Sequence, residues 1–193
     1  MPKVGMEPIR RSALVKATID EIGAVGNLDV TVSQIAKRAG MSSGLAHHYF
    51  GGKEQIFLAA MRHTLIVYAA EVRGAVAMAN SPLERLHAVI KAGFGTTNFR
   101  REVIASWLNF YVLAQTSNEA RRLLNIYQHR LHSNLAYNLR PLAGDQAPDI
   151  AARLCGLIDG IYLHEALGKK APNRESATAQ VLKALELELE RFK

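Results

Sequence analysis

The chain has 193 residues, of which 49% are hydrophobic and 21% are charged, the composition of an ordinary globular protein with a sizeable core. Its net charge of +7 is compatible with a polyanionic partner, but residues 1–60 contain seven basic and five acidic side chains, so the charge is not concentrated there. The single cysteine, Cys155, excludes an internal disulfide bond and lies in an apolar run, where we expect a buried core residue.

The sequence has no features of a membrane or secreted protein. No apolar stretch reaches the roughly 18 residues that a membrane span needs. Residues 1–12 are polar and basic, without the apolar centre of a signal peptide. We therefore expect a cytoplasmic protein with no membrane contact.

Apolar residues recur at helical spacing along nearly the whole chain, and no segment of useful length alternates as a β-strand requires. The breaks in this pattern coincide with glycine, proline and capping residues. The sequence therefore predicts an all-α fold, with helices over 8–25, 32–39, 43–49, 53–79, 82–95, 101–116, 118–142, 148–168 and 174–192.

Residues 31–50 read TVSQIAKRAGMSSGLAHHYF, the pattern of two short helices joined by a tight turn. Thr31 and Gln34 can form a capping box at the start of the first helix, and Gly40 can supply the left-handed backbone of the turn. Ser42 can cap the second helix, which could then protrude into a DNA major groove while the first crosses the phosphate backbone. A helical hairpin without a partner is the alternative interpretation.

The predicted outer surface of this helix-turn-helix carries groups that suit DNA. Hydroxyl and imidazole groups can hydrogen-bond base edges or phosphates, small residues allow close approach, and lysines attract phosphate. The candidate DNA-binding residues are Thr31, Gln34, Lys37, Ser42, Ser43, Gly44, Ala46, His47, His48, Tyr49 and Lys53.

The segment TVSQIAKRAGMSSGLAHHYFGGKEQIFLAAM resembles the DNA-binding domain of the TetR family of repressors. The likeness rests on the capped helix, the turn at Ala39 and Gly40, a short helix that ends in Tyr-Phe, and the following Lys-Glu. It implies a nine-helix fold and a repressor rather than an enzyme. The N-terminal three-helix DNA-binding domain would cover 1–52, extending to about 68, and a domain for effector binding and dimerisation would cover 53–193.

The likeness continues along the chain. The segments MPKVGMEPIRR, AHHYFGGKE, RLHSNL and LIDGIYL are similar to choline-responsive members of that family, which repress genes of glycine betaine synthesis. The resemblance implies choline as the effector, a palindromic double-stranded operator, and a homodimer formed by the last two helices, about 148–168 and 174–192. A TetR-type repressor for a different small apolar or cationic effector is the alternative.

Aromatic residues in the C-terminal part indicate how such an effector could bind. Trp107, Phe110 and Tyr111 are spaced to share one helix face, and aromatic faces bind quaternary ammonium groups through cation–π attraction. An aromatic stripe is also typical of an ordinary core, so both interpretations stay open. The candidate ligand-binding residues are Trp107, Asn109, Phe110, Tyr111, Tyr127, Asp159 and Tyr162.

No motif indicates catalysis, a metal or a cofactor. The sequence has no Gly-rich phosphate loop or nucleophile elbow, and its histidine pairs lack further ligands at the spacing of a zinc site. We therefore predict no catalytic residues, no metal and no cofactor. A purely structural helical module is the remaining alternative, and it would show no salt-dependent affinity for DNA.

Overall fold

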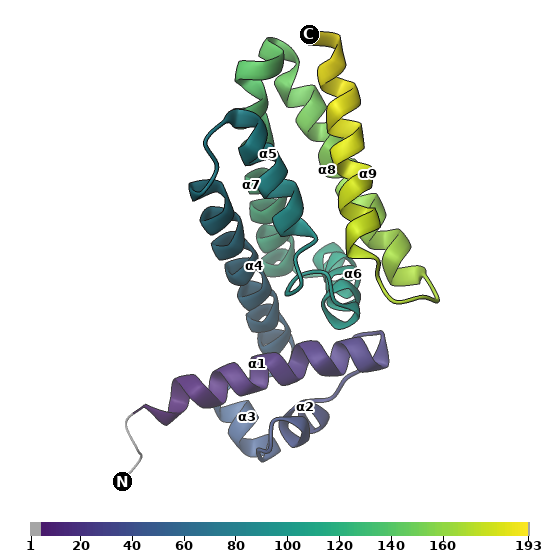
Figure 1. Cartoon of the computed structure of the whole chain (residues 1–193). Coiled ribbons are helices and arrows are strands. Elements are labelled where there is room, and N and C mark those ends of the chain that lie inside the picture. Colours follow the sequence, from purple (N-terminus) through teal and green to yellow (C-terminus); the bar gives the residue numbers. More distant parts are fainter. Residues whose placement is uncertain (1–4, 193) are drawn as a thin grey trace.

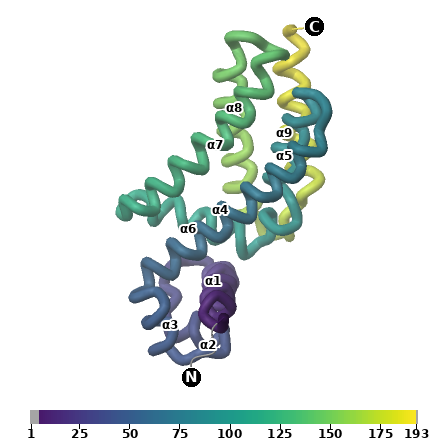
Figure 2. Tube along the Cα trace, turned by 90° about the vertical axis from the view of Figure 1, so that its left-hand side faces the viewer, coloured from purple at the N-terminus to yellow at the C-terminus, as the bar shows by residue number. Residues whose placement is uncertain are grey.

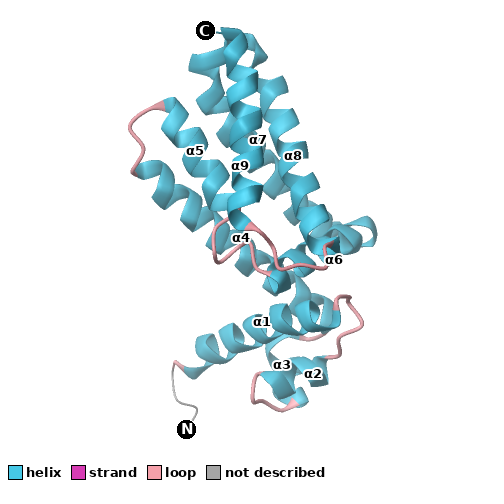
Figure 3. Cartoon of the chain, turned by 45° about the vertical axis from the view of Figure 1, so that its right-hand side comes forward, coloured by secondary structure: helices cyan, strands magenta, loops and turns pink. Residues whose placement is uncertain are grey.

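The computed structural model describes residues 5–192, which are helical almost throughout and contain no strand (Figure 3). The predicted all-α fold with nine helices is confirmed for this part of the chain. Residues 1–4 and 193 lie outside the described residues. The predicted N-terminal domain and the segment MPKVGMEPIRR both include residues 1–4, and the predicted C-terminal domain includes residue 193. The α-helices are α1 (Met6–Val25), α2 (Val32–Arg38), α3 (Ser43–Phe50), α4 (Lys53–Ala77), α5 (Pro82–Gly93), α6 (Arg101–Thr116), α7 (Asn118–Ala143), α8 (Ala147–Leu167) and α9 (Arg174–Leu189).

The molecule has a small end and a large end. α1, α2 and α3 gather at the small end, and α5, α7, α8 and α9 form a bundle above them whose far end holds the C-terminus (Figure 1). α4 runs from the small end along the bundle, as the view turned by 90° also shows (Figure 2). Two 3-10 helices, η1 (Gly144–Gln146) and η2 (Glu190–Phe192), follow α7 and α9.

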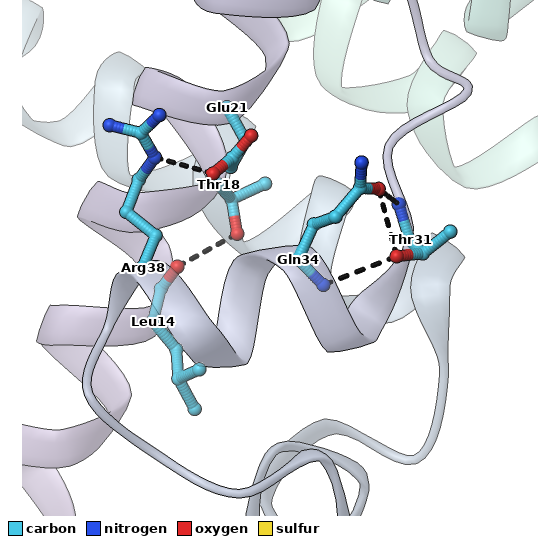
Figure 4. Close-up of polar contacts among 6 residues, drawn as sticks. All are labelled: Leu14, Thr18, Glu21, Thr31, Gln34 and Arg38. Carbon is cyan, nitrogen blue, oxygen red and sulfur yellow. Dashed lines mark hydrogen bonds and ion pairs between the residues drawn. The ribbon is translucent and has the colours of Figure 1, made fainter.

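Both ends of α2 are stabilised as predicted. The Thr31 hydroxyl accepts the backbone N–H of Gln34 at 3.1 Å, and the Gln34 side-chain oxygen accepts the N–H of Thr31 at 2.7 Å (Figure 4). At the other end Gly40 has a φ of +68°, and the N–H of Met41 donates to the carbonyl of Ala36 at 2.8 Å. This pattern is a Schellman motif, which favours glycine at the left-handed position.

The small end has a core of its own. Leu14 of α1 and Ile35 of α2 are fully buried in it, and an ion pair of 2.6 Å between Arg38 and Glu21 joins α2 to α1 at the surface (Figure 4). Ile56 and Phe57 of α4 are buried in the same cluster. The first turns of α4 are therefore part of the small end.

α6 packs directly on α1. The Asn109 side chain donates to the carbonyl of Gly26 at 3.1 Å, and a Cβ atom at Gly23 would lie only 2.5 Å from the Cα atom of Glu102. Only glycine permits this approach, because any other residue would collide with the backbone of α6. The small end is thus held to the bundle by α6 as well as by α4.

We expect Gly23→Ala to lower the free energy of unfolding by about 1–3 kcal/mol, because the added methyl group overpacks the contact with α6. Urea unfolding at a fixed protein concentration measures the change. Gly74→Ala is the matched control, since Gly74 is exposed in α4 with open space around its Cβ position. Alanine there should raise stability by about 0.5–1 kcal/mol, and a similar gain at Gly23 would contradict the close contact.

Candidate DNA interface and effector site

Most of the predicted DNA-binding residues lie at the surface of the small end. Ser33 Oγ on α2 donates to Ser43 Oγ on α3 at 3.3 Å, which holds the beginnings of the two helices together. Ser43 and Tyr49 are half-buried, and the other predicted residues, apart from Ala46, are exposed: Thr31, Gln34, Lys37, Ser42, Gly44, His47, His48 and Lys53.

Ala46 does not belong to this surface. Its exposed fraction is 0%, and it lies in the core cluster of the small end together with Ile35 and Ala36 of α2. The reason is the helical repeat, because Ala46 lies three and four residues before the half-buried Tyr49 and Phe50 and shares their inward face. The prediction that Ala46 faces DNA was wrong, and its small side chain instead lets α3 pack closely on α2.

The structure adds two arginines that sequence reasoning missed. The Arg10 guanidinium donates to the Tyr49 hydroxyl at 3.5 Å, and the guanidinium carbon of Arg11 lies 5.1 Å from the centre of the Phe50 ring. Arg11 also lies 5.5 Å from the Tyr49 ring centre. Both cations come from α1, so their position beside α3 depends on tertiary packing, and only their charge was visible in the sequence.

A small enclosed cavity of about 10 Å³ lies inside the bundle and is lined largely by aromatic rings. Trp107 of α6 and Tyr127 of α7 are the closest pair, with ring centres 4.7 Å apart, and Tyr68 of α4 lies 5.8 Å from Tyr127. Tyr162 of α8 completes the wall, and its hydroxyl donates to the carbonyl of Gly93. We call this space the aromatic cavity, and it brings together three of the predicted ligand-binding residues: Trp107, Tyr127 and Tyr162.

Two other predicted residues lie elsewhere. Asn109 points toward α1, where it donates to Gly26, and the Phe110 ring is buried in a cluster with Trp107 and residues of α1 and α4. Phe110 touches the cavity only indirectly, through an edge-on contact with Trp107 at 5.9 Å between ring centres. Neither side chain lines the cavity, because α6 is enclosed on more than one side and only part of its apolar surface faces inward.

Residues of two other segments contribute to the cavity or its surroundings in a way that the sequence did not reveal. Tyr68 comes from α4, and Asn98 comes from the loop between α5 and α6, where its amide donates to the Glu71 carboxylate. Phe94 and Phe99 of the same loop flank Tyr162, at 5.6 and 5.0 Å between ring centres. The two phenylalanines of this loop could have indicated a buried segment. The sequence could not show that they face Tyr162, because this depends on how α5 and α6 meet.

A half-buried carboxylate lies close enough to the cavity tyrosines to interact with them electrostatically, although it does not line the cavity. Asp159 of α8 accepts a hydrogen bond from the Tyr111 hydroxyl at 3.1 Å. Burial raises the pKa of Asp159, and the hydrogen bond from Tyr111 opposes that rise only in part. Burial, followed by the charge of Asp159, also raises the pKa of the half-buried Cys155 thiol to about 11, so this cysteine is a thiol at neutral pH.

The sequence was compared with known families. Residues 14–60 match the family described as bacterial regulatory proteins, tetR family, and residues 82–190 match the BetI-type transcriptional repressor C-terminal family. The chain belongs to the TetR family. Relatives named HTH-type transcriptional regulator BetI are 50% identical in Brucella anthropi, over 94% of each chain, and 44% identical in Agrobacterium fabrum, over 100% of this chain and 94% of the relative. The protein is therefore a transcriptional repressor of the TetR family rather than an enzyme.

Solved structures agree with this fold. A TetR transcription regulator from Haloarcula marismortui has a TM-score of 0.83 at 14% identity, covering 93% of this chain and 98% of that one. A transcriptional regulator from Saccharomonospora viridis, solved in complex with choline, has a TM-score of 0.80 at 22% identity, covering 91% of this chain and 95% of that one. TetR-family regulators bind DNA and small-molecule effectors.

Two further features concern the membrane and metal ions. Between residues 5 and 192 no helix has the length and hydrophobicity to cross a membrane. In the same part of the chain no three His, Cys, Asp or Glu side chains are grouped so that they could hold a metal ion.

We expect Asp159→Asn to raise the stability of the ligand-free protein at pH 7. Since the folded-state pKa of Asp159 lies above its unfolded value, the folded protein keeps the proton at a pH where the unfolded chain has lost it. The contribution of Asp159 to stability therefore falls as pH rises through that interval, and the advantage of the variant should vanish below it. Urea midpoints at pH 7 and pH 3 measure this, and Glu190→Gln, at an exposed carboxylate, is the control. A variant less stable than the parent at pH 7 would contradict an unfavourable charge at the half-buried Asp159.

Proposed function

We propose that this repressor controls genes for the synthesis of glycine betaine from choline, with choline as the effector that changes its affinity for operator DNA. The observation that carries this proposal is the aromatic cavity with Asp159 beside it. The BetI name of relatives up to 50% identical and the choline complex of a structural neighbour support it.

The cavity has the chemistry that a quaternary ammonium requires. Such a cation has no N–H to donate, so it is bound by aromatic faces and by nearby negative charge rather than by strong hydrogen bonds. Trp107, Tyr68, Tyr127 and Tyr162 supply the faces, and Asp159 supplies the charge. The hydroxyl of choline would need an additional acceptor, and Asn98 at the cavity wall is suited to that role.

The cavity must widen to admit choline. Its volume of about 10 Å³ holds roughly one water molecule. Tyr68 is on α4, which reaches the core of the small end, and Trp107 is on α6, which contacts α1. Movement of either wall would therefore shift the helix-turn-helix. Choline would favour the widened arrangement over the closed one only to the extent that it binds the widened arrangement more tightly.

We further propose that the protein acts as a homodimer on a palindromic operator. Leu163 and Leu167 of α8 and Leu187 of α9 have exposed fractions of 46%, 73% and 52%, and Gly156 has open space at its Cβ position. A second copy would cover this surface and place two DNA-binding units about 34–36 Å apart, one turn of DNA. In this arrangement 1–52 serves as the DNA-binding domain, and 53–193 serves for effector binding and dimerisation.

A gel-shift titration with the DNA upstream of the protein's own gene tests the proposed function. We expect retardation whose affinity falls steeply with salt, because phosphate contacts release counterions. Choline should change the protein concentration at half-saturation, whereas sodium chloride at equal ionic strength should not. Lys37→Ala should weaken binding and reduce the salt slope by about two, one for each subunit of the proposed dimer. DNA binding that is unchanged by millimolar choline would reject choline as the effector but keep the repressor.

Tyr127→Leu is expected to weaken choline binding about tenfold, because it removes one aromatic face from the cavity. Tyr127→Phe keeps the face and should bind like the parent. Calorimetry measures the affinities, and emission of Trp107, the chain's single tryptophan, gives an independent signal 4.7 Å from the altered ring. If the leucine and phenylalanine variants bind choline equally well, the ring of Tyr127 is ordinary core.

A further inference from the structure

A second and larger hollow lies on the outside of the bundle between α4 and α7. It has a volume of about 580 Å³, within the size range of small-molecule sites. We call it the α4–α7 groove. Its floor is apolar, and Ile66 and Ile126 remain 65% and 38% exposed in it, which is unusual for large aliphatic side chains on adjacent helices.

The charged residues that line the groove are all arginines. Arg62 pairs with Glu119, which is not part of the lining. Arg73 and Arg130 form no ion pair and no side-chain hydrogen bond with any residue between 5 and 192. Asn134 adds a further polar group on α7. The groove thus combines an apolar floor with two guanidinium groups that have no carboxylate partner.

We propose that the α4–α7 groove binds a small anionic amphiphile, a carboxylate with a medium-length alkyl chain. The alkyl chain would cover Ile66 and Ile126, and the carboxylate would be attracted by both Arg73 and Arg130 through charge-assisted hydrogen bonds. Burial of a chain on this floor supplies the hydrophobic part of the affinity. A cation is disfavoured, because it would meet only positive charges.

The groove is distinct from the aromatic cavity. Tyr68 and Tyr127 line both spaces, so these two rings form the partition between them. The two sites have opposite charge preference, with a carboxylate beside the inner one and arginines beside the outer one. Binding in the groove does not depend on choline being the effector, so failure of one proposal leaves the other intact.

Calorimetry with octanoate on the full-length, choline-free protein tests the proposal. We expect octanoate to bind and octyltrimethylammonium, which has the same alkyl chain and the opposite charge, to bind at least tenfold more weakly. Arg73→Gln and Arg130→Gln should each weaken octanoate binding about fivefold, the size of one exposed ion pair. Arg140→Gln, at an exposed position of α7 outside the groove, is the matched control.

Ile66→Glu provides a second test, since Ile66 is exposed enough for a charge to be tolerated without loss of the fold. Octanoate binding should be abolished, while the thermal unfolding midpoint stays near that of the parent. Three results would overturn the proposal: equal binding of the anion and the cation, attachment to phosphatidylglycerol vesicles without binding of free octanoate, or a change of oligomeric state in Ile66→Glu, which would assign the groove to a contact between copies.

Discussion

The close contact between α1 and α6 at Gly23 is the constraint on which the rest of the structure depends. A side chain at this position would meet the backbone of Glu102, so the contact exists only because Gly23 has no Cβ atom. The Asn109 amide of α6 donates to the carbonyl of Gly26 at the end of α1. The Ser117 hydroxyl donates to Glu54 at 2.7 Å, which ties the end of α6 to the first turn of α4. The helix-turn-helix is therefore attached to the bundle through two helices whose ends are joined to each other.

This attachment explains how a small internal event can be transmitted to DNA. Trp107 lines the aromatic cavity, while Ser106, its neighbour on α6, contacts the carbonyl of Ile19 on α1 at 3.5 Å. A helix that is packed on both sides moves as a rigid unit, because protein interiors have few voids to absorb a displacement. The half-buried Asp159 is poorly solvated as a carboxylate, so under the proposed function an entering cation would relieve an unfavourable charge. In that proposal, selectivity for a cation and readiness to rearrange have a common origin.

Those parts of the structure that depend only on neighbouring residues along the chain could be predicted from the sequence. The capping box at Thr31, the turn at Gly40 and all nine helices could be predicted because caps and helical periodicity are local. Contacts between distant segments could not be predicted in the same way. Tyr68 reaches the cavity from α4, and Asn109 turns to α1 instead, because both depend on the angle at which helices cross. Ala46 was predicted on the outer face of its helix but lies on the inner one, because the face that α3 turns inward is set by its packing on α2.

The distribution of charge also bears on the repressor mechanism. Residues 1–60 contribute little of the net charge of +7, and three arginines instead line the α4–α7 groove. A small end with few cations has weak nonspecific attraction for DNA, because that attraction scales with the number of phosphates neutralised. On the proposed DNA-binding surface, operator affinity would then come from a few placed groups, such as Lys37, His47 and Tyr49 with its arginine neighbours. In the proposed dimer these groups would act in both subunits at once, so a slight change in the spacing of the two units would remove most of the affinity. A small movement of α4 or α6 would then be enough to act as a switch.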